Sequence, residues 1–209
     1  MKRLIILLAL LIPTTLSAQW DTLTYSRLKP KMEPLIGATL LAGATLVSVR
    51  PELHQYEVSM YDNLHLADVQ KLQFDNYLQF VPITAPIVLS AAGLKSKHNT
   101  GQISLLSAVS AVLGLAAIET GKLLYQVERP DGMSYTSFPS GHTYMAFTGA
   151  EIIRREFGRS YPWLTYVGYG VAALVGAMRV YNSRHWPSDV LGGVGVALLS
   201  VNVTYWLFE

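Results

Sequence analysis

Phe138–Tyr144, which reads Phe-Pro-Ser-Gly-His-Thr-Tyr, lies where a proline-containing loop should turn into an apolar helix. Ser140 is a favourable N-cap residue, and the mostly apolar and small residues after it predict a helix up to Ile153. A helix N-terminus carries unpaired N–H groups and partial positive charge, which suit a phosphate group. Gly141 would let the backbone approach a ligand, and His142 would face that ligand from the first turn. Such a stretch is more often simply a capped helix with a surface histidine. The residues on either side have to decide between that interpretation and a phosphate-binding site.

The composition is that of a membrane protein. Of the 209 residues, 51% are hydrophobic and only 14% are charged, which suits one membrane-embedded domain better than a soluble globule. The net charge of +2, without a basic run, gives no support for a nucleic-acid partner. The chain has no cysteine, so disulfides, a thiolate zinc site and a lipid-modified cysteine are excluded.

The N-terminus resembles a secretory signal peptide. Lys2 and Arg3 precede an apolar run over residues 4–12, and small or polar residues follow up to Ala18, after which cleavage is predicted. Residues 19–76 form a polar N-terminal region with one short apolar segment, 34–49. Its last part, from Arg50 onward, is amphipathic and predicts one or two helices outside the hydrocarbon.

Six apolar blocks predict an all-α, polytopic membrane bundle of five or six transmembrane helices. The first and fourth blocks are shorter than the roughly 20 residues of a straight span, so they either lean on polar flanks or stay buried behind neighbours. Glycines in these blocks favour close helix packing in lipid. Residues 77–209, which hold five of the blocks, form the predicted membrane-embedded core. The blocks are residues 34–49, 77–94, 102–124, 142–153, 161–180 and 190–208.

Two further groups of unusual residues interrupt the apolar background. The first spans residues 122–130, where Lys122 and Arg129 are seven apart and would project from one helix face if the helix continues until Pro130 ends it. The alternative is a lysine that extends to the lipid headgroups, with Glu119 one turn earlier to neutralise it.

The second group spans residues 179–189. His185 and Asp189 are four apart with Pro187 between them, a spacing that suits the start of a helix. In that geometry the carboxylate could hold one ring nitrogen of His185 and make the other more nucleophilic. The alternative is a capped loop with Trp186 as a residue of the membrane interface.

Together the three motifs supply two histidines, one aspartate and three permanent cations. No cluster with metal-ligand spacing is present, and two histidines alone make a poor metal site. The set suits phosphoryl transfer, in which one histidine attacks phosphorus, the other protonates the leaving oxygen, and the cations bind the remaining oxygens. In an antiparallel bundle, the connections that carry the motifs lie on the same membrane face.

The pattern Lys-x6-Arg-Pro, Pro-Ser-Gly-His and Arg-x5-His-x3-Asp resembles the type-2 phosphatidic-acid phosphatase superfamily of lipid phosphate phosphatases. The resemblance covers the chain from about Leu72 to the C-terminus, and it implies hydrolysis without a metal or other cofactor. The position before the third-motif arginine, usually serine in the family, is Met178. The resemblance implies that His185 is the nucleophile, Asp189 its orienting partner and His142 the general acid, and that Lys122, Arg129, Arg179, Ser140 and Gly141 bind the phosphate.

The sequence therefore predicts an integral-membrane phosphatase of a lipid phosphomonoester or diphosphate. Lipid A, undecaprenyl diphosphate, phosphatidylglycerol phosphate and phosphatidic acid all remain open as substrates. One alternative is a vanadium-dependent haloperoxidase-like enzyme, which shares the oxyanion-binding signature. Another is a non-catalytic lipid-phosphate binder or transporter. The expected partners are the lipid substrate and the bilayer, and no obligate protein partner is evident.

The expected location is a bacterial inner membrane with the site facing the periplasm. Five basic residues lie around the connections after the second and fourth blocks, and the positive-inside rule makes those connections cytoplasmic. Counting crossings from a cleaved signal peptide gives the opposite result if residues 34–49 span the membrane. We give the loop charges more weight, with residues 34–49 only partly inserted or packed against the bundle. The basic residues are Lys95, Lys97, Arg154, Arg155 and Arg159.

Overall fold

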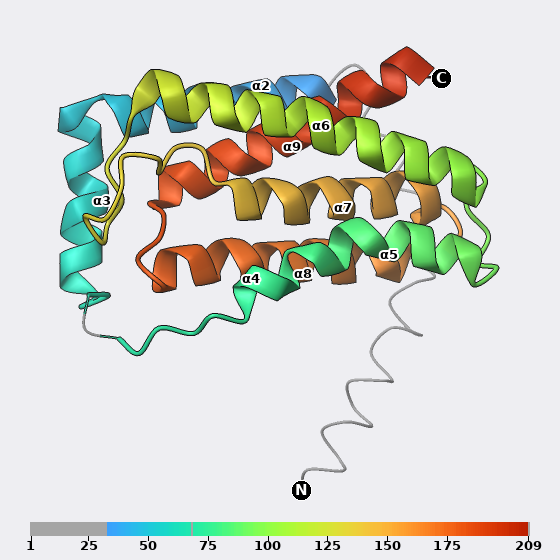
Figure 1. Cartoon of the computed structure of the whole chain (residues 1–209), viewed down its shortest axis with the longest axis horizontal. Coiled ribbons are helices and arrows are strands. Elements are labelled where there is room, and N and C mark those ends of the chain that lie inside the picture. Colours follow the sequence, from blue (N-terminus) through green and yellow to red (C-terminus); the bar gives the residue numbers. More distant parts are fainter. Residues whose placement is uncertain (1–32, 68, 209) are drawn as a thin grey trace, which may run out of the picture.

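The computed structural model describes residues 33–67 and 69–208, and in that part of the chain all the regular structure is helical, as predicted (Figure 1). The predicted signal peptide lies outside the described residues. The helices are α2 (Glu33–Val49), α3 (Pro51–Asn63), α4 (Asp75–Leu78), α5 (Phe80–Ala91), α6 (Thr100–Tyr125), α7 (Gly141–Phe157), α8 (Pro162–Tyr181) and α9 (Pro187–Phe208). Five of the six apolar blocks each fall on one helix, and the second block, 77–94, covers the end of α4 and the whole of α5.

Within the described ranges, three helices are long and apolar enough to cross a membrane: α6, α8 and α9. A fourth span is possible if α2 and α3, which meet at an angle of 85°, count together. The protein is thus a helical membrane protein with three to four candidate spans by length and composition. The predicted number of five or six is not reached on that criterion.

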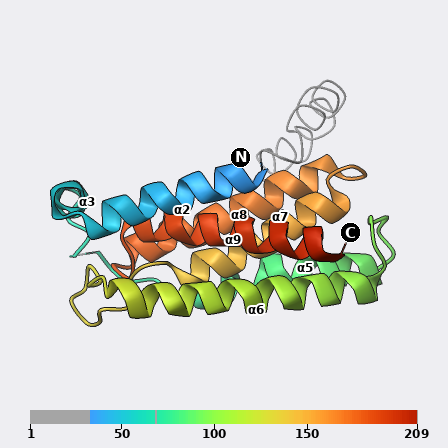
Figure 2. The ribbon, with the colours of Figure 1, turned by 90° about the horizontal axis from the view of Figure 1, so that it is seen from above.

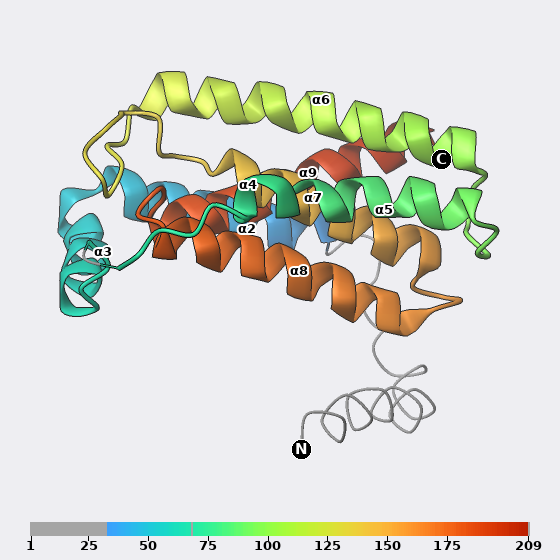
Figure 3. The same ribbon diagram turned by 60° about the horizontal axis from the view of Figure 1, so that its bottom comes forward.

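The fourth apolar block becomes the centre of the bundle. Helix α7 is surrounded by α5, α6, α8 and α9 (Figures 1 and 3), and most of its side chains are buried. Helix α2 packs along α9 on the other side, as seen from above in Figure 2. Burial behind neighbours, one of the two options for this short block, is therefore what the fold adopts. The first turn of α7, which carries His142, is held between the surrounding helices.

Local sequence explains where α6 begins, but not where it ends. Asn99 and Gln102 form a reciprocal capping box, with Gln102 N 2.9 Å from Asn99 Oδ1 and Asn99 N 3.2 Å from Gln102 Oε1. The helix stops at Tyr125 because Gln126 has a left-handed backbone, with φ of 46°. The condition under which Lys122 and Arg129 would share one helix face, a helix that continues to Pro130, is therefore not met. Arg129 instead lies in a turn, where its N–H donates to Ser134 O at 2.9 Å.

The end of the bundle away from the motifs holds a buried ionic cluster. Glu151, only 2% exposed, accepts hydrogen bonds from Arg154 at 2.6 and 2.8 Å and from Arg155 at 2.8 Å. Both arginines also bind Glu33 at the start of α2. Arg154 and Arg155 therefore belong to α7 and not to the connection after it, which corrects the placement assumed from the sequence. Arg159 is the basic residue left in that connection.

Candidate active site

The three sequence motifs meet at one end of the bundle, shown at the left of Figure 1. His142 lies in the first turn of α7, Arg179 in the last turn of α8, and His185 in the short connection from α8 to α9. The ring of His142 interacts electrostatically with Arg179, His185 and Arg129. The ammonium group of Lys122 lies 4.0 Å from the place a Cβ atom would take on Gly141. The convergence expected from topology is therefore present.

Asp189 is held firmly by its neighbours. Its Oδ2 accepts hydrogen bonds from Trp186 N at 2.7 Å and from Ser137 Oγ at 2.5 Å. Helix α9 begins at Pro187, as the spacing predicted, and this start brings Nδ1 of His185 to 3.5 Å from the same carboxylate oxygen. That separation is an ion-pair contact, longer than a good hydrogen bond. Asp189 thus faces Nδ1, which leaves Nε2 of His185 as the nitrogen available for chemistry.

The environment of His185 favours the neutral form of its ring. The side chain is almost completely enclosed, with 2% of the residue exposed. Burial lowers the pKa of the His185 ring below its usual value, and the nearby Asp189 carboxylate partly opposes that shift. The ring is therefore uncharged at neutral pH. With its proton on Nδ1, facing Asp189, the lone pair is on Nε2.

Ser140 is the N-cap of α7, as predicted. Its hydroxyl oxygen accepts from Thr143 N at 3.5 Å and from Thr143 Oγ1 at 3.0 Å, and the residue is fully buried. Its backbone N–H donates to the carbonyl oxygen of Asp189 at 3.0 Å, which joins the second motif to the third. This close approach needs Gly193, because a Cβ there would lie 2.6 Å from Ser140 O. A direct contact between Ser140 and phosphate stays a prediction.

The cations offer several unused donors. Nε of Arg129 and Nε of Arg179 are buried without a hydrogen-bond partner among the described residues. Lys122 is paired with Glu119 at 2.6 Å, as the sequence suggested, and Glu119 is largely exposed. Guanidinium groups with free N–H donors are well suited to phosphate oxygens.

Sequence reasoning missed α4, which covers the site. Its Asp75 is 1% exposed and accepts from Arg179 Nη1 at 2.7 Å. The next residue, Asn76, places Oδ1 3.1 Å from His142 Nε2 and 3.4 Å from Arg179 Nη1. An Asp-Asn pair at the edge of an apolar block reads as an ordinary helix start, so nothing in the local pattern marked it.

Helix α3 supports the site from outside the bundle. Glu57 accepts from Ser188 N at 2.6 Å and from Ser188 Oγ at 2.7 Å at the start of α9. The ring of His54 contacts the edge of Trp186, with ring centroids 4.7 Å apart. The amphipathic stretch after α2 thus fixes the first turn of α9, which carries Asp189.

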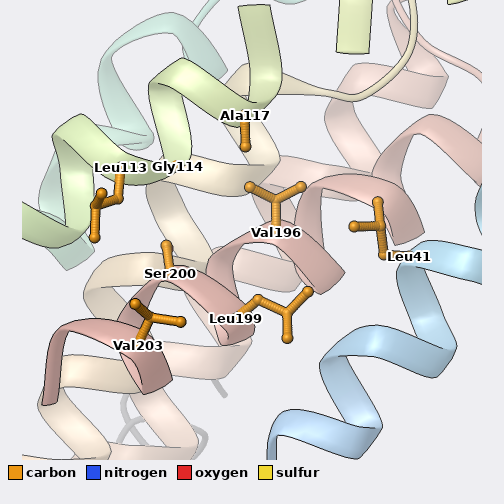
Figure 4. A pocket seen from close by; sticks show the side chains of 8 residues that line it. All are labelled: Leu41, Leu113, Gly114, Ala117, Val196, Leu199, Ser200 and Val203. Carbon is orange, nitrogen blue, oxygen red and sulfur yellow. The ribbon is translucent and has the colours of Figure 1, made fainter. Parts of the chain in front are cut away.

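An apolar cavity of about 250 Å³ lies elsewhere, between α2, α6 and α9 (Figure 4). None of its lining residues belongs to the candidate site. It is lined by Leu41, Leu113, Gly114, Ala117, Val196, Leu199, Ser200 and Val203. Over the described ranges, no three His, Asp or Glu side chains gather in a way that could hold a metal ion.

Residues 97–209 match the PAP2 superfamily. The chain belongs to this superfamily. A PAP2 relative is the lipid A 1-phosphatase of Porphyromonas gingivalis, 32% identical over 177 residues, which are 84% of this chain and 38% of the relative. The undecaprenyl-diphosphatase of Sulfolobus acidocaldarius is 28% identical over 125 residues, 54% of this chain and 56% of that protein. The chain thus spans a little under two fifths of the length of the first relative and a little over half of that of the second.

Two solved structures share the fold. One is a transmembrane PAP2-type phosphatidylglycerolphosphate phosphatase from Bacillus subtilis, with a TM-score of 0.59 and 20% identity over 87% of this chain and 96% of that one. The other is LpxE from Aquifex aeolicus, with a TM-score of 0.51 and 17% identity over 84% of this chain and 93% of that one. At these identities the likeness concerns the fold alone.

Proposed function

We propose that this PAP2 protein is a metal-independent phosphatase that hydrolyses a phosphomonoester or diphosphate of a membrane lipid. The observation that carries the proposal is the meeting of His142, the His185–Asp189 pair and three cations at one end of a membrane bundle. A nucleophile, an acid and fixed positive charge are what phosphoryl transfer requires.

The proposed reaction proceeds in two steps. Nε2 of His185 attacks phosphorus, the bond to the ester oxygen breaks, and that oxygen takes a proton from His142. A water molecule then attacks the phosphohistidine, gives its proton to His142, and releases inorganic phosphate with His185 restored. Asp189 stabilises the positive charge that develops on the His185 ring. Lys122, Arg129 and Arg179, with the Gly141 amide and Ser140, would hold the other phosphate oxygens.

The relatives support a lipid as substrate, because two of them are named for lipid A and undecaprenyl diphosphate and a structural neighbour for phosphatidylglycerol phosphate. Purified full-length protein in detergent is expected to release inorganic phosphate from at least one of these lipids or from phosphatidic acid. Because three fixed cations take the place of a divalent ion, excess EDTA should leave the rate unchanged, and vanadate should inhibit. Phosphate release measured with and without EDTA tests this.

Three results would contradict the proposal. Loss of activity on chelation, restored by a divalent ion, would show that the chemistry needs a metal. Tight binding of these lipids without any phosphate release would favour a non-catalytic binder. Halide oxidation by the vanadate-loaded protein would favour the haloperoxidase alternative.

We propose further that five or six segments cross a bacterial inner membrane. The number is five if α2 is only partly inserted or packed against the bundle, as a periplasm-facing site after a cleaved signal peptide requires. Helices α2 and α7 have 17 residues each, and at 1.5 Å per residue they are about 25 Å long, close to the thickness of the hydrocarbon layer. Helices α4 and α5 together span residues 75–91. All six segments run along the bundle in Figures 1 and 2, while α3 lies across its end.

We expect the site to face the periplasm, because Lys95, Lys97 and Arg159 lie in the connections at the other end of the bundle. Ser96→Cys and Ser134→Cys, made singly, should decide this, since the chain has no other cysteine. In cells stripped of their outer barrier, an impermeant maleimide should label position 134 and not position 96. Labelling in permeabilised cells shows that both thiols can react, and the reverse pattern in intact cells would mean a cytoplasmic site.

A further inference from the structure

We propose that Asn76 is a positioning residue for His142, and that Asp75 and Asn182 hold α4 in the place where Asn76 can act. The inference rests on the proposed function, because it concerns proton transfer to the leaving oxygen. It adds a polar group from outside the three motifs to the catalytic arrangement.

The first step is the anchoring of α4. Asn182, which follows α8 and is buried, accepts from Leu72 N at 2.9 Å and donates to Leu72 O at 2.5 Å. Its Nδ2 also donates to Asp75 Oδ1 at 3.0 Å, while Asp75 Oδ2 accepts from Arg179 at 2.7 Å. Both oxygens of a buried carboxylate are thus satisfied by the end of α8. A buried carboxylate with a hydrogen bond to each oxygen restrains the helix that carries it, here α4.

The second step is the contact that this anchoring produces. Asn76 Oδ1 lies 3.1 Å from His142 Nε2 and 3.4 Å from Arg179 Nη1. The side-chain oxygen of Asn76 faces both groups, and an amide oxygen can only accept a hydrogen bond. His142 must therefore carry a proton on Nε2 to donate to it. The ring nitrogen left for the substrate is Nδ1.

The third step is a comparison of the two histidines. Each has one ring nitrogen facing an acceptor of the protein: Nδ1 of His185 faces Asp189, and Nε2 of His142 faces Asn76. A carboxylate raises the basicity of its partner, which suits a nucleophile. A neutral amide fixes the ring without strengthening its hold on the proton, which suits an acid. It also adds no negative charge beside Arg179, where the phosphate would bind.

The proton balance follows from this arrangement. In the complex with substrate, where the negative charge of the phosphate favours a charged ring, His142 begins with protons on both nitrogens and gives the one on Nδ1 to the leaving oxygen. It becomes a neutral ring whose remaining proton stays on Nε2, bonded to Asn76. In the second step Nδ1 takes a proton from the attacking water, which restores the starting state.

The test compares two substrates that differ in their need for an acid, an alkyl phosphate and nitrophenyl phosphate. Asn76→Ala should lower kcat for the alkyl phosphate by roughly 10- to 100-fold, because a misdirected acid loses part of its effect. It should leave kcat for nitrophenyl phosphate within about twofold, since that leaving group needs little protonation. Gln73→Ala is the matched control, because Gln73 is exposed on the same segment, one turn before Asn76. It should change neither rate.

The double variant Asn76→Ala/His142→Ala separates positioning from a structural role. If Asn76 acts through His142, the double variant should be no slower than His142→Ala alone. Asn76→Asp keeps an acceptor oxygen that can hold the ring, but its charge strengthens the hold of His142 on the proton. It should therefore recover only part of kcat for the alkyl phosphate and raise KM through repulsion of the phosphate. This variant also keeps the test open if the alanine variant fails to fold.

The other possible results of these measurements would each overturn either the role of Asn76 or the role of His142. The positioning role of Asn76 is wrong if the loss of kcat depends on the leaving group in His142→Ala but not in Asn76→Ala. It is also wrong if the losses of kcat in the two single variants add in the double variant. In either case the proposed function stands. A rate increase in Asn76→Ala would also overturn the positioning role. If His142→Ala shows no dependence on the leaving group, the general-acid role assigned to His142 fails first, and this inference fails with it.

Discussion

His185→Ala is expected to abolish turnover, with a loss on the order of 10⁴-fold or more, and to abolish any phosphoenzyme. The substitution removes Nε2, the atom proposed to attack phosphorus, while Asp189 keeps its bonds to Trp186 N and Ser137 Oγ. Rapid acid-free quenching after mixing with labelled substrate measures the phosphoenzyme, which should be labile to acid and stable to alkali.

His65→Asn provides a control for the loss of a histidine. His65 is exposed and has a left-handed backbone, with φ of 50°, which asparagine tolerates. This variant should keep full activity and full labelling. The assignment of the nucleophile would be wrong if His185→Ala, shown to be folded by its thermal unfolding, still formed a labelled phosphohistidine.

His142→Ala is expected to slow hydrolysis of an alkyl phosphate by roughly 10² to 10⁴, the usual range for the loss of a general acid. The loss should be smaller for a substrate with a good leaving group, since such an oxygen departs without a proton. Steady-state kcat for the two substrates measures the difference. Because the same residue is proposed to deprotonate water in the second step, a phosphoenzyme should accumulate in this variant.

The pattern of labelling in the two histidine variants checks the roles against each other. Accumulation in His185→Ala together with none in His142→Ala would mean that the two histidines exchange roles. Equal losses for both substrates in His142→Ala would show that this ring binds the phosphate without moving a proton.

The local features of the site followed from the sequence. The cap at Ser140, the start of α9 at Pro187 and the contact between Glu119 and Lys122 each depend on residues no more than four apart. Capping and helix periodicity act over that range, so the residue pattern alone is enough to predict them. The six apolar blocks were found for the same reason. The order of the three motifs also indicated the PAP2 family.

Other features depended on how distant segments pack. Whether Arg129 lies on α6 could not be decided from the sequence, because the left-handed turn at Gln126 has no glycine to mark it. Arg154 and Arg155 looked like loop charges until Glu33, more than 100 residues earlier, proved to be their partner. A single sequence contains no periodic signal for contacts at such separations.

The sequence by itself determined the apolar helices, the cap of α7 and the histidines, carboxylate and cations of the candidate site, because each of these depends on residues within one or two turns of chain. Only the tertiary structure decided what surrounds those groups. Asn76 reaches His142 across 66 residues, and Glu57 reaches the start of α9 across 131. These contacts exist because α3 turns by 85° from α2 and the chain then returns to place α4 against α8. Their physical basis is the burial of polar groups that must find partners inside the bundle, and that requirement is met only by the packed fold.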